Sequence, residues 1–126
     1  MASTINTVSF DCADPRRLAD FWCIALGYKA LDVDDEEAFI GPGGGASGLY
    51  FQRVPEGKVV KNRVHLDLRP PRSMADEVER LRNAGATDQR FVEEEGSFWT
   101  IMLDPEGNEF CVLRGPEDGW SPEHWA

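Results

Sequence analysis

Residues 4–27 read TINTVSFDCADPRRLADFWCIALG, and residues 62–85 read NRVHLDLRPPRSMADEVERLRNAG. Each stretch predicts a strand, then a capped helix, then a glycine that ends the helix. The two glycines, Gly27 and Gly85, lie 58 positions apart. The chain therefore contains the same unit twice. A fold built from two copies tends to place its binding site where the copies face each other, so the repeat indicates where a functional site is expected.

The first copy begins with a strand over Thr4–Cys12, in which apolar and polar residues alternate with the period of a half-buried strand. Thr7, Ser9 and Asp11 share its polar face. Asp14-Pro15 then reads as an N-cap followed by proline at the first helical position. The apolar residues Leu18, Phe21, Trp22, Ala25 and Leu26 form one helical stripe. Gly27 can adopt the left-handed conformation that ends the helix.

The second copy begins with a strand over Arg63–Arg69. Its apolar residues alternate with His65, Asp67 and Arg69, which share the other face. Ser73 is expected to cap a helix that runs to Ala84. The offset of 58 residues pairs Thr7 with His65, Ser9 with Asp67, and Asp11 with Arg69.

Three further strands complete each copy. In the first they are predicted at Tyr28–Val33, Ala38–Ile40 and Leu49–Arg53, and in the second at Phe91–Glu94, Phe98–Leu103 and Glu109–Leu113. The expected fold is α+β, with two tandem β-α-β-β-β modules forming a cupped mixed sheet. Residues 1–126 are expected to form a single domain, with module one at about 4–54, module two at about 62–114 and a tail over 115–126. Since one helix covers one face of each sheet, the other face is expected to line a trough.

Composition excludes several classes of function. The net charge of −10 and the lack of a basic stripe argue against nucleic acid as a partner. No apolar run approaches the roughly 20 residues of a membrane span, and the N-terminus lacks the pattern of a signal peptide. Three cysteines without a disulfide spacing favour reduced thiols and a cytoplasmic location. The expected partner is a small molecule.

Several motifs carry a resemblance to a known family. DCADP at 11–15, LADFW at 18–22, FQRVP at 51–55, KNRVHLD at 61–67 and LDPEGNE at 103–109 resemble the glyoxalase-like branch of the vicinal oxygen chelate superfamily. That superfamily includes glyoxalase I, extradiol dioxygenases, bleomycin-binding proteins and fosfomycin-resistance enzymes. The resemblance covers roughly residues 4–114 and implies a homodimer with its site in the trough.

The resemblance also implies a divalent metal held by the first and last strands of each module. The corresponding positions here are Thr7, Gln52, His65 and Cys111. Cys111 stands where the family usually has a glutamate, and no carboxylate at these positions offsets the charge of a dication. A catalytic divalent site requires three or more histidine or carboxylate ligands. The sequence therefore predicts no metal and no other cofactor.

His65 has two interpretations. In the first, it is satisfied in an ordinary hydrogen-bond network with Asp67 and Arg69; in the second, it acts as a general base or acid helped by Asp67 or Asp11. His65 and Asp67 are the candidate catalytic residues. The residues expected to contact a ligand in the trough are Thr7, Ser9, Asp11, Tyr50, Gln52, His65, Arg69, Trp99 and Cys111.

Three functions remain open, and so does the question of whether the chain is an enzyme. The first is binding of a small organic molecule in the trough without a catalytic metal, and the sequence favours it. The second is metal-independent proton transfer by His65. The third is a metal-dependent glyoxalase-type lyase or dioxygenase, which the resemblance suggests and the residues at the ligand positions oppose.

Overall fold

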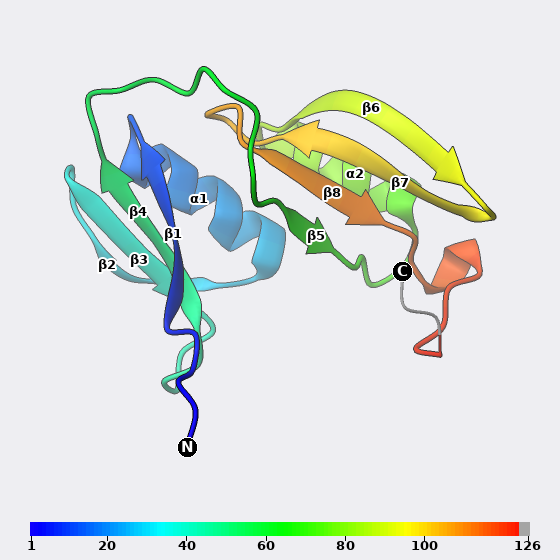
Figure 1. The fold of residues 1–126 in the computed structure, drawn as a ribbon, viewed down its shortest axis with the longest axis horizontal. Helices are drawn as coiled ribbons and strands as arrows, with labels where there is room; N and C mark the ends of the chain where they lie inside the picture. The colour runs from blue at the N-terminus through cyan, green and yellow to red at the C-terminus, as the bar shows by residue number, and fades with distance from the viewer. Residues whose placement is uncertain (124–126) are drawn as a thin grey trace. The chain divides into compact units, whose positions relative to one another are not determined.

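The computed structural model describes residues 1–123. The chain forms two compact units, one over Met1–Val59 and one from Val60 onward. The boundary falls in the segment that joins the two predicted modules. Each unit contains one helix and a four-stranded sheet of its own, as Figure 1 shows. The α+β class and the duplicated β-α-β-β-β order are confirmed. Within each module the four strands bond into a separate sheet.

Module one forms the first sheet, with strand order β1-β4-β3-β2. Its β1 and β4 run parallel and the other neighbours antiparallel. One helix, α1, packs against β2, β3 and β4. The elements are β1 (Thr7–Cys12), α1 (Pro15–Leu26), β2 (Lys29–Val33), β3 (Glu37–Gly41) and β4 (Gly48–Arg53).

Module two repeats this plan in the second sheet, with strand order β5-β8-β7-β6 and a parallel pair between β5 and β8. Its helix, α2, packs against β6, β7 and β8. A short 3-10 helix, η1, follows the sheet. The elements are β5 (Leu66–Leu68), α2 (Met74–Ala84), β6 (Thr87–Glu94), β7 (Ser97–Leu103), β8 (Glu109–Leu113) and η1 (Pro116–Asp118).

The helices begin and end where local signals predict. The Asp14 carboxylate accepts a hydrogen bond from the Arg17 backbone N–H at 3.2 Å, and the Ser73 hydroxyl accepts one from the Asp76 N–H at 3.1 Å. Gly27 ends α1 in the left-handed region, at φ 69°, and its N–H donates to the Cys23 carbonyl at 2.9 Å. These caps satisfy backbone groups that a helix end leaves unpaired.

Each helix buries its apolar stripe against its own sheet. In module one, Leu18, Phe21 and Trp22 are fully buried together with Ile40 and Phe51. In module two, the buried residues include Val78 and Leu81 of α2 and Met102, Phe110 and Val112 of the sheet. The helix covers one face of each sheet.

The strands depart from the predicted bounds where pairing rather than pattern sets their length. β1 begins at Thr7 instead of Thr4, and β5 covers only Leu66–Leu68 instead of Arg63–Arg69. β6 is longer than predicted and begins at Thr87, because it pairs with β7 over its whole length. His65 therefore lies immediately before β5.

The tail is anchored to module two by η1. The Asp118 carboxylate accepts hydrogen bonds from the backbone N–H groups of Met74 at 2.7 Å and Gly115 at 2.9 Å. These contacts agree with the packed tail that Trp120 predicts. Trp125, the other tail tryptophan, lies outside the described residues, as does His124. None of the helices within residues 1–123 is long and apolar enough to cross a membrane.

Candidate functional site

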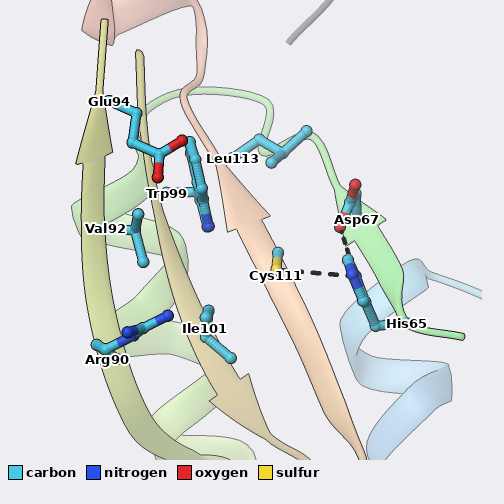
Figure 2. A pocket seen from close by; sticks show the side chains of 9 residues that line it. All are labelled: His65, Asp67, Arg90, Val92, Glu94, Trp99, Ile101, Cys111 and Leu113. Carbon is cyan, nitrogen blue, oxygen red and sulfur yellow. Dashed lines mark hydrogen bonds and ion pairs between the residues drawn. The ribbon is translucent and has the colours of Figure 1, made fainter. Parts of the chain in front are cut away.

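A pocket with a volume of about 370 Å³ opens on the second sheet, on the face that points away from α2 (Figure 2). The alternation along β7 explains this. Thr100 and Met102 are buried on the helix side, and the Thr100 hydroxyl lies 3.4 Å from the Met74 sulfur of α2. Trp99 and Ile101 therefore point to the open side, where they line the pocket.

Strand register aligns four of the pocket residues in one row across the sheet. Arg90 of β6 pairs with Ile101 of β7, which pairs with Cys111 of β8, which pairs with Asp67 of β5. A second row joins Val92, Trp99 and Leu113. Residues opposite one another in neighbouring strands share a face, so the two rows build one continuous lining. Glu94 and His65 complete it.

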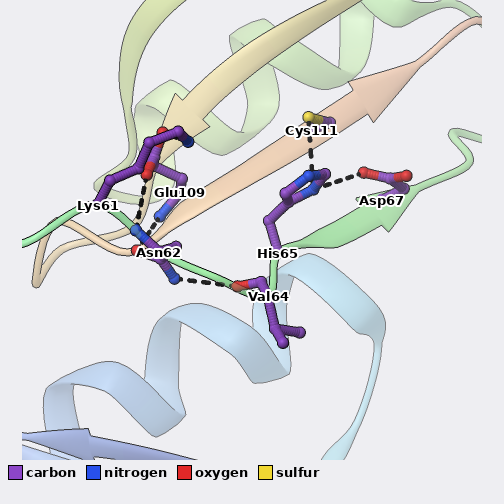
Figure 3. Close-up of polar contacts among 7 residues, drawn as sticks. All are labelled: Lys61, Asn62, Val64, His65, Asp67, Glu109 and Cys111. Carbon is purple, nitrogen blue, oxygen red and sulfur yellow. Dashed lines mark hydrogen bonds and ion pairs between the residues drawn. The ribbon is translucent and has the colours of Figure 1, made fainter.

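His65, Asp67 and Cys111 form the densest polar cluster in the pocket, shown in Figure 3. The Nδ1 atom of His65 lies 3.0 Å from Asp67 Oδ1 and 3.9 Å from Cys111 Sγ. His65 and Asp67 have side chains that are 45% and 50% exposed, so the pair faces the open pocket. Cys111 is buried beneath them. These three are the one group within residues 1–123 with three potential metal-ligand atoms close together, all within 4.8 Å of one another.

Cys111 is held as a neutral thiol. Burial, followed by the negative charge and hydrogen bond of Asp67 and the charge of Glu109, raises the pKa of Cys111 to about 11 against the opposing effect of Lys61. A nucleophilic cysteine requires a lowered pKa. The thiol therefore contributes to the pocket as a small, weakly polar wall.

We expect Cys111 to resist alkylation in protein held in EDTA. At a pKa of about 11, only about one thiol in ten thousand is ionised at pH 7. Because the folded pKa lies above the ordinary value, the rate with iodoacetamide should rise about tenfold per pH unit through pH 9 and beyond. Peptide mapping by mass spectrometry gives the rate, with a cysteine peptide as reference. A rate that levels off below pH 9 would contradict this prediction.

Glu109 fixes the segment before His65, and this role was not predicted from the sequence. Glu109 Oε2 lies 2.9 Å from Lys61 Nζ, and Oε1 accepts the Asn62 backbone N–H at 3.0 Å. The Asn62 side chain in turn accepts from the Glu109 N–H and donates to the Val64 carbonyl (Figure 3). Glu109 shares a strand face with Cys111 at a spacing of two, which is the signal that could have found it. It positions the segment that carries His65, immediately before β5.

Arg69, a predicted ligand contact, is engaged elsewhere. Its guanidinium donates to the Arg114 carbonyl at 2.7 Å and stacks 3.9 Å from the centre of the Trp120 ring. Burial and the nearby Arg114 lower the pKa of Arg69, and Asp67 opposes them. Arg69 does not line the pocket. It connects β5 to the tail.

The five predicted site residues of module one lie on the two parallel strands of the first sheet. Ser9 pairs with Tyr50, and Asp11 pairs with Gln52. In module two the residue 58 positions after Ser9, Asp67, pairs with Cys111. By register, Tyr50 is therefore the counterpart of Cys111. The Tyr50 hydroxyl donates to Glu37, and this contact raises the pKa of Tyr50.

The structure thus brings four predicted site residues into one pocket, His65, Asp67, Trp99 and Cys111. It adds five that were not predicted, which are Arg90, Val92, Glu94, Ile101 and Leu113. Arg90, Val92 and Glu94 alternate along β6 at a spacing of two. That alternation is present in the sequence. The predicted strand began at Phe91 and therefore left out Arg90, whereas β6 begins at Thr87.

The four positions that the resemblance implies for a metal do not make a fitting set for a hard cation. Thr7 and Gln52 offer weak neutral oxygens, and Cys111 offers a soft sulfur. Asp67 changes the chemistry of the set, because its carboxylate lies beside His65 and the thiol. The donors that the pocket itself brings together are one imidazole nitrogen, one carboxylate and one thiol.

A family model described as a glyoxalase-like domain matches residues 7–113. Among solved structures, the fold is similar to a glyoxalase/bleomycin resistance protein/dioxygenase family enzyme from Burkholderia phytofirmans PsJN. That comparison has a TM-score of 0.71 and 17% identity, and it covers 87% of this chain and 97% of the other. No curated protein matches the sequence significantly.

Two further structures have ligands in their descriptions. One is a mutant of the fosfomycin resistance protein from Listeria monocytogenes, complexed with Mn(II) and 1S,2S-dihydroxypropylphosphonic acid, with a TM-score of 0.73, 14% identity and coverage of 98% and 100%. The other is a bleomycin-binding protein from Streptomyces verticillus, complexed with copper(II)-bleomycin, with a TM-score of 0.61, 16% identity and coverage of 91% and 98%. At these identities the likeness concerns the fold.

Proposed function

Since the chain belongs to the glyoxalase-like domain family, we propose that it binds a small, flat organic molecule in the module-two pocket and needs no metal to do so. The observation that carries this proposal is the pocket beside Trp99. Its volume of about 370 Å³ falls within the range of about 300–1,000 Å³ that is usual for ligand sites. Structural relatives described with bound drugs or small acids support a binding role for the fold.

The walls of the pocket indicate the class of ligand. Trp99, Val92, Ile101 and Leu113 supply an apolar surface on which a flat ring system can stack. Figure 2 shows Trp99 and Glu94 on one side of the pocket and His65 with Asp67 on the other. Two carboxylates against one guanidinium, Arg90, favour a ligand with hydrogen-bond donors or positive charge. The net charge of −10 acts in the same direction.

A matched ligand panel tests this class. Flat aromatic amines and aromatic carboxylates of equal size would be compared by thermal shift and then by calorimetry. The amines are expected to bind more tightly, because the carboxylates meet Glu94 and Asp67 with like charge. Tighter binding of the carboxylates would overturn the proposed class.

Replacing Trp99 by alanine is expected to weaken binding of the best amine by about 10- to 100-fold, since it removes the stacking surface. The matched control is Phe91→Ala. Phe91 is 56% exposed and contacts Phe98 at a ring-centre distance of 6.0 Å, on the face of the sheet opposite the pocket. That variant should bind like the wild type. Equal affinity in Trp99→Ala and the wild type, measured by calorimetry, would exclude this pocket as the site.

Metal-independent proton transfer is a second candidate, favoured by one contact. Asp67 Oδ1 lies 3.0 Å from His65 Nδ1, and this interaction leaves Nε2 as the ring atom available to a bound molecule. The fate of the ligand separates the two functions. A ligand recovered unchanged after long incubation supports binding alone. A product whose formation stops in His65→Gln, with binding retained, would establish the enzyme.

A further inference from the structure

We propose that Arg90 makes the module-two pocket selective for a flat molecule with a carboxylate at one end and a positive charge at the other. The inference rests on the proposed function and deepens it, because it names the charged groups that the ligand carries. Its basis is the order of the side chains along β6. Arg90, Val92 and Glu94 line the pocket in turn, and they give this wall a cationic end, an apolar middle and an anionic end (Figure 2).

The strand fixes the spacing of these three side chains. At about 3.3 Å per residue, the backbone positions of Arg90 and Glu94 are separated by about 13 Å along β6. The pairing of β6 with β7 is regular over this stretch, and its one irregularity falls before Arg90. Val92 pairs with Trp99 at the midpoint, so the stacking surface lies between the two charges. Two linked aromatic rings with a charged group at each end fit this arrangement.

Both charges on β6 are available to a ligand. Among residues 1–123, neither Arg90 nor Glu94 forms an ion pair, and both residues are exposed. The other carboxylate of the pocket, Asp67, already lies 3.0 Å from the His65 ring. Glu94 is therefore the carboxylate that a ligand cation reaches without displacing another contact, and Arg90 is the guanidinium that a ligand anion reaches in the same way.

The chemistry of the guanidinium specifies a carboxylate. Arginine binds a carboxylate through two parallel N–H···O bonds, which adds directional preference to the charge. A ligand that stacks on Trp99 displaces water from the wall beside Arg90, and a plain amine offers the guanidinium no acceptor in exchange. A site with such a polar group discriminates against the analogue that lacks the matching partner. Arg90 therefore selects among the amines that Trp99 can stack.

Three biphenyls test this pairing of charges by calorimetry on the full chain. The first carries an aminomethyl group at one end, and the second carries in addition a carboxylate at the far end. The third is the isomer with the carboxylate on the ring that bears the aminomethyl group. The second should bind about tenfold more tightly than the first, as one charge-assisted bidentate contact provides. The isomer should gain nothing, because its carboxylate lies near Glu94 instead of Arg90.

Three variants assign the preference to Arg90. Arg90→Gln should abolish it and should bind the plain amine slightly more tightly, because a like charge is removed. Arg90→Lys keeps the charge without the planar fork and should keep only part of the preference. The matched control is Arg82→Gln on α2, which packs against the other face of the sheet. It removes the same charge from a residue paired with Asp88 and should keep the full preference. Circular dichroism confirms that each variant is folded.

The outcomes separate this inference from the proposed function. The role of Arg90 is overturned, and the proposed function stands, if the plain amine binds through Trp99 but the far-end carboxylate adds no affinity. The same holds if the preference survives in Arg90→Gln. Equal losses for all three biphenyls in that variant would mean that Arg90 serves only as a charge on β6, which is an edge strand. Failure of every flat amine to bind would overturn both proposals.

Discussion

Replacement of Trp22 by alanine is expected to lower the free energy of unfolding by about 3–5 kcal/mol. Trp22 is 1% exposed and lies at the centre of the module-one core, with ring-centre distances of 5.2 Å to Phe21 and 6.0 Å to Phe10. Alanine would leave a cavity that the surrounding rings can fill only in part. Such a loss is a large share of the roughly 5–15 kcal/mol that stabilises a typical domain.

Urea denaturation followed by far-ultraviolet circular dichroism measures this loss. The control is Ile24→Ala on the same helix, since Ile24 is 51% exposed and contributes little to the core. That substitution should change stability by no more than about 0.5 kcal/mol. Equal losses in the two variants would mean that Trp22 does not act through core packing.

The second large effect is expected for Asp104→Ala, at about 3 kcal/mol or more of unfolding free energy. Asp104 is 3% exposed in the turn between β7 and β8. Its carboxylate accepts the backbone N–H of Glu106 at 2.9 Å, and the backbone and side-chain N–H groups of Asn108 at 3.0 and 2.9 Å. Alanine leaves these donors without their acceptor, and Asn108 is itself buried. The same turn joins the two strands that carry Trp99 and Cys111.

Asp104→Asn provides a graded comparison. The amide keeps one acceptor oxygen in place, so its cost should be clearly smaller than that of alanine, at about 1–2 kcal/mol. Chemical denaturation of both variants gives the order. If the two substitutions cost the same, the turn depends on the negative charge rather than on the number of acceptors.

The helices were predictable because their signals are local. Asp14, Ser73 and Gly27 each act within one turn of chain, and the structure confirms all three. The strands were less predictable because pairing decides their length. β5 is an edge strand that pairs only with β8, and ahead of it the Asn62 N–H bonds to the Glu109 side chain instead of to a strand. No local pattern in the sequence encodes that exchange.

The site residues also divide into those with a local signal in the sequence and those that depend on strand pairing. Alternation along single strands placed His65 and Asp67 on one face, and the pocket contains both. Arg90 and Glu94 were missed because the antiparallel pairing of β6 with β7 brings them to that face. Arg69 obeys the alternation, yet its guanidinium is bound by the Arg114 carbonyl and the Trp120 ring. A periodic pattern shows which face Arg69 lies on, but it does not show that a backbone carbonyl and an aromatic ring will bind its guanidinium.

One atom, Nδ1 of His65, faces both Asp67 and Cys111. In a hydrolase triad the imidazole bridges its partners with different nitrogens, taking a proton from the nucleophile on one side while the acid holds the other. Here the two partners compete for the same nitrogen, so the ring cannot relay a proton from the thiol toward the carboxylate. His65, Asp67 and Cys111 are residue types found in cysteine protease sites, but their hydrogen bonds do not connect them in the way that such a site requires. Electrophilic inhibitors designed for such proteases should therefore leave Cys111 unmodified.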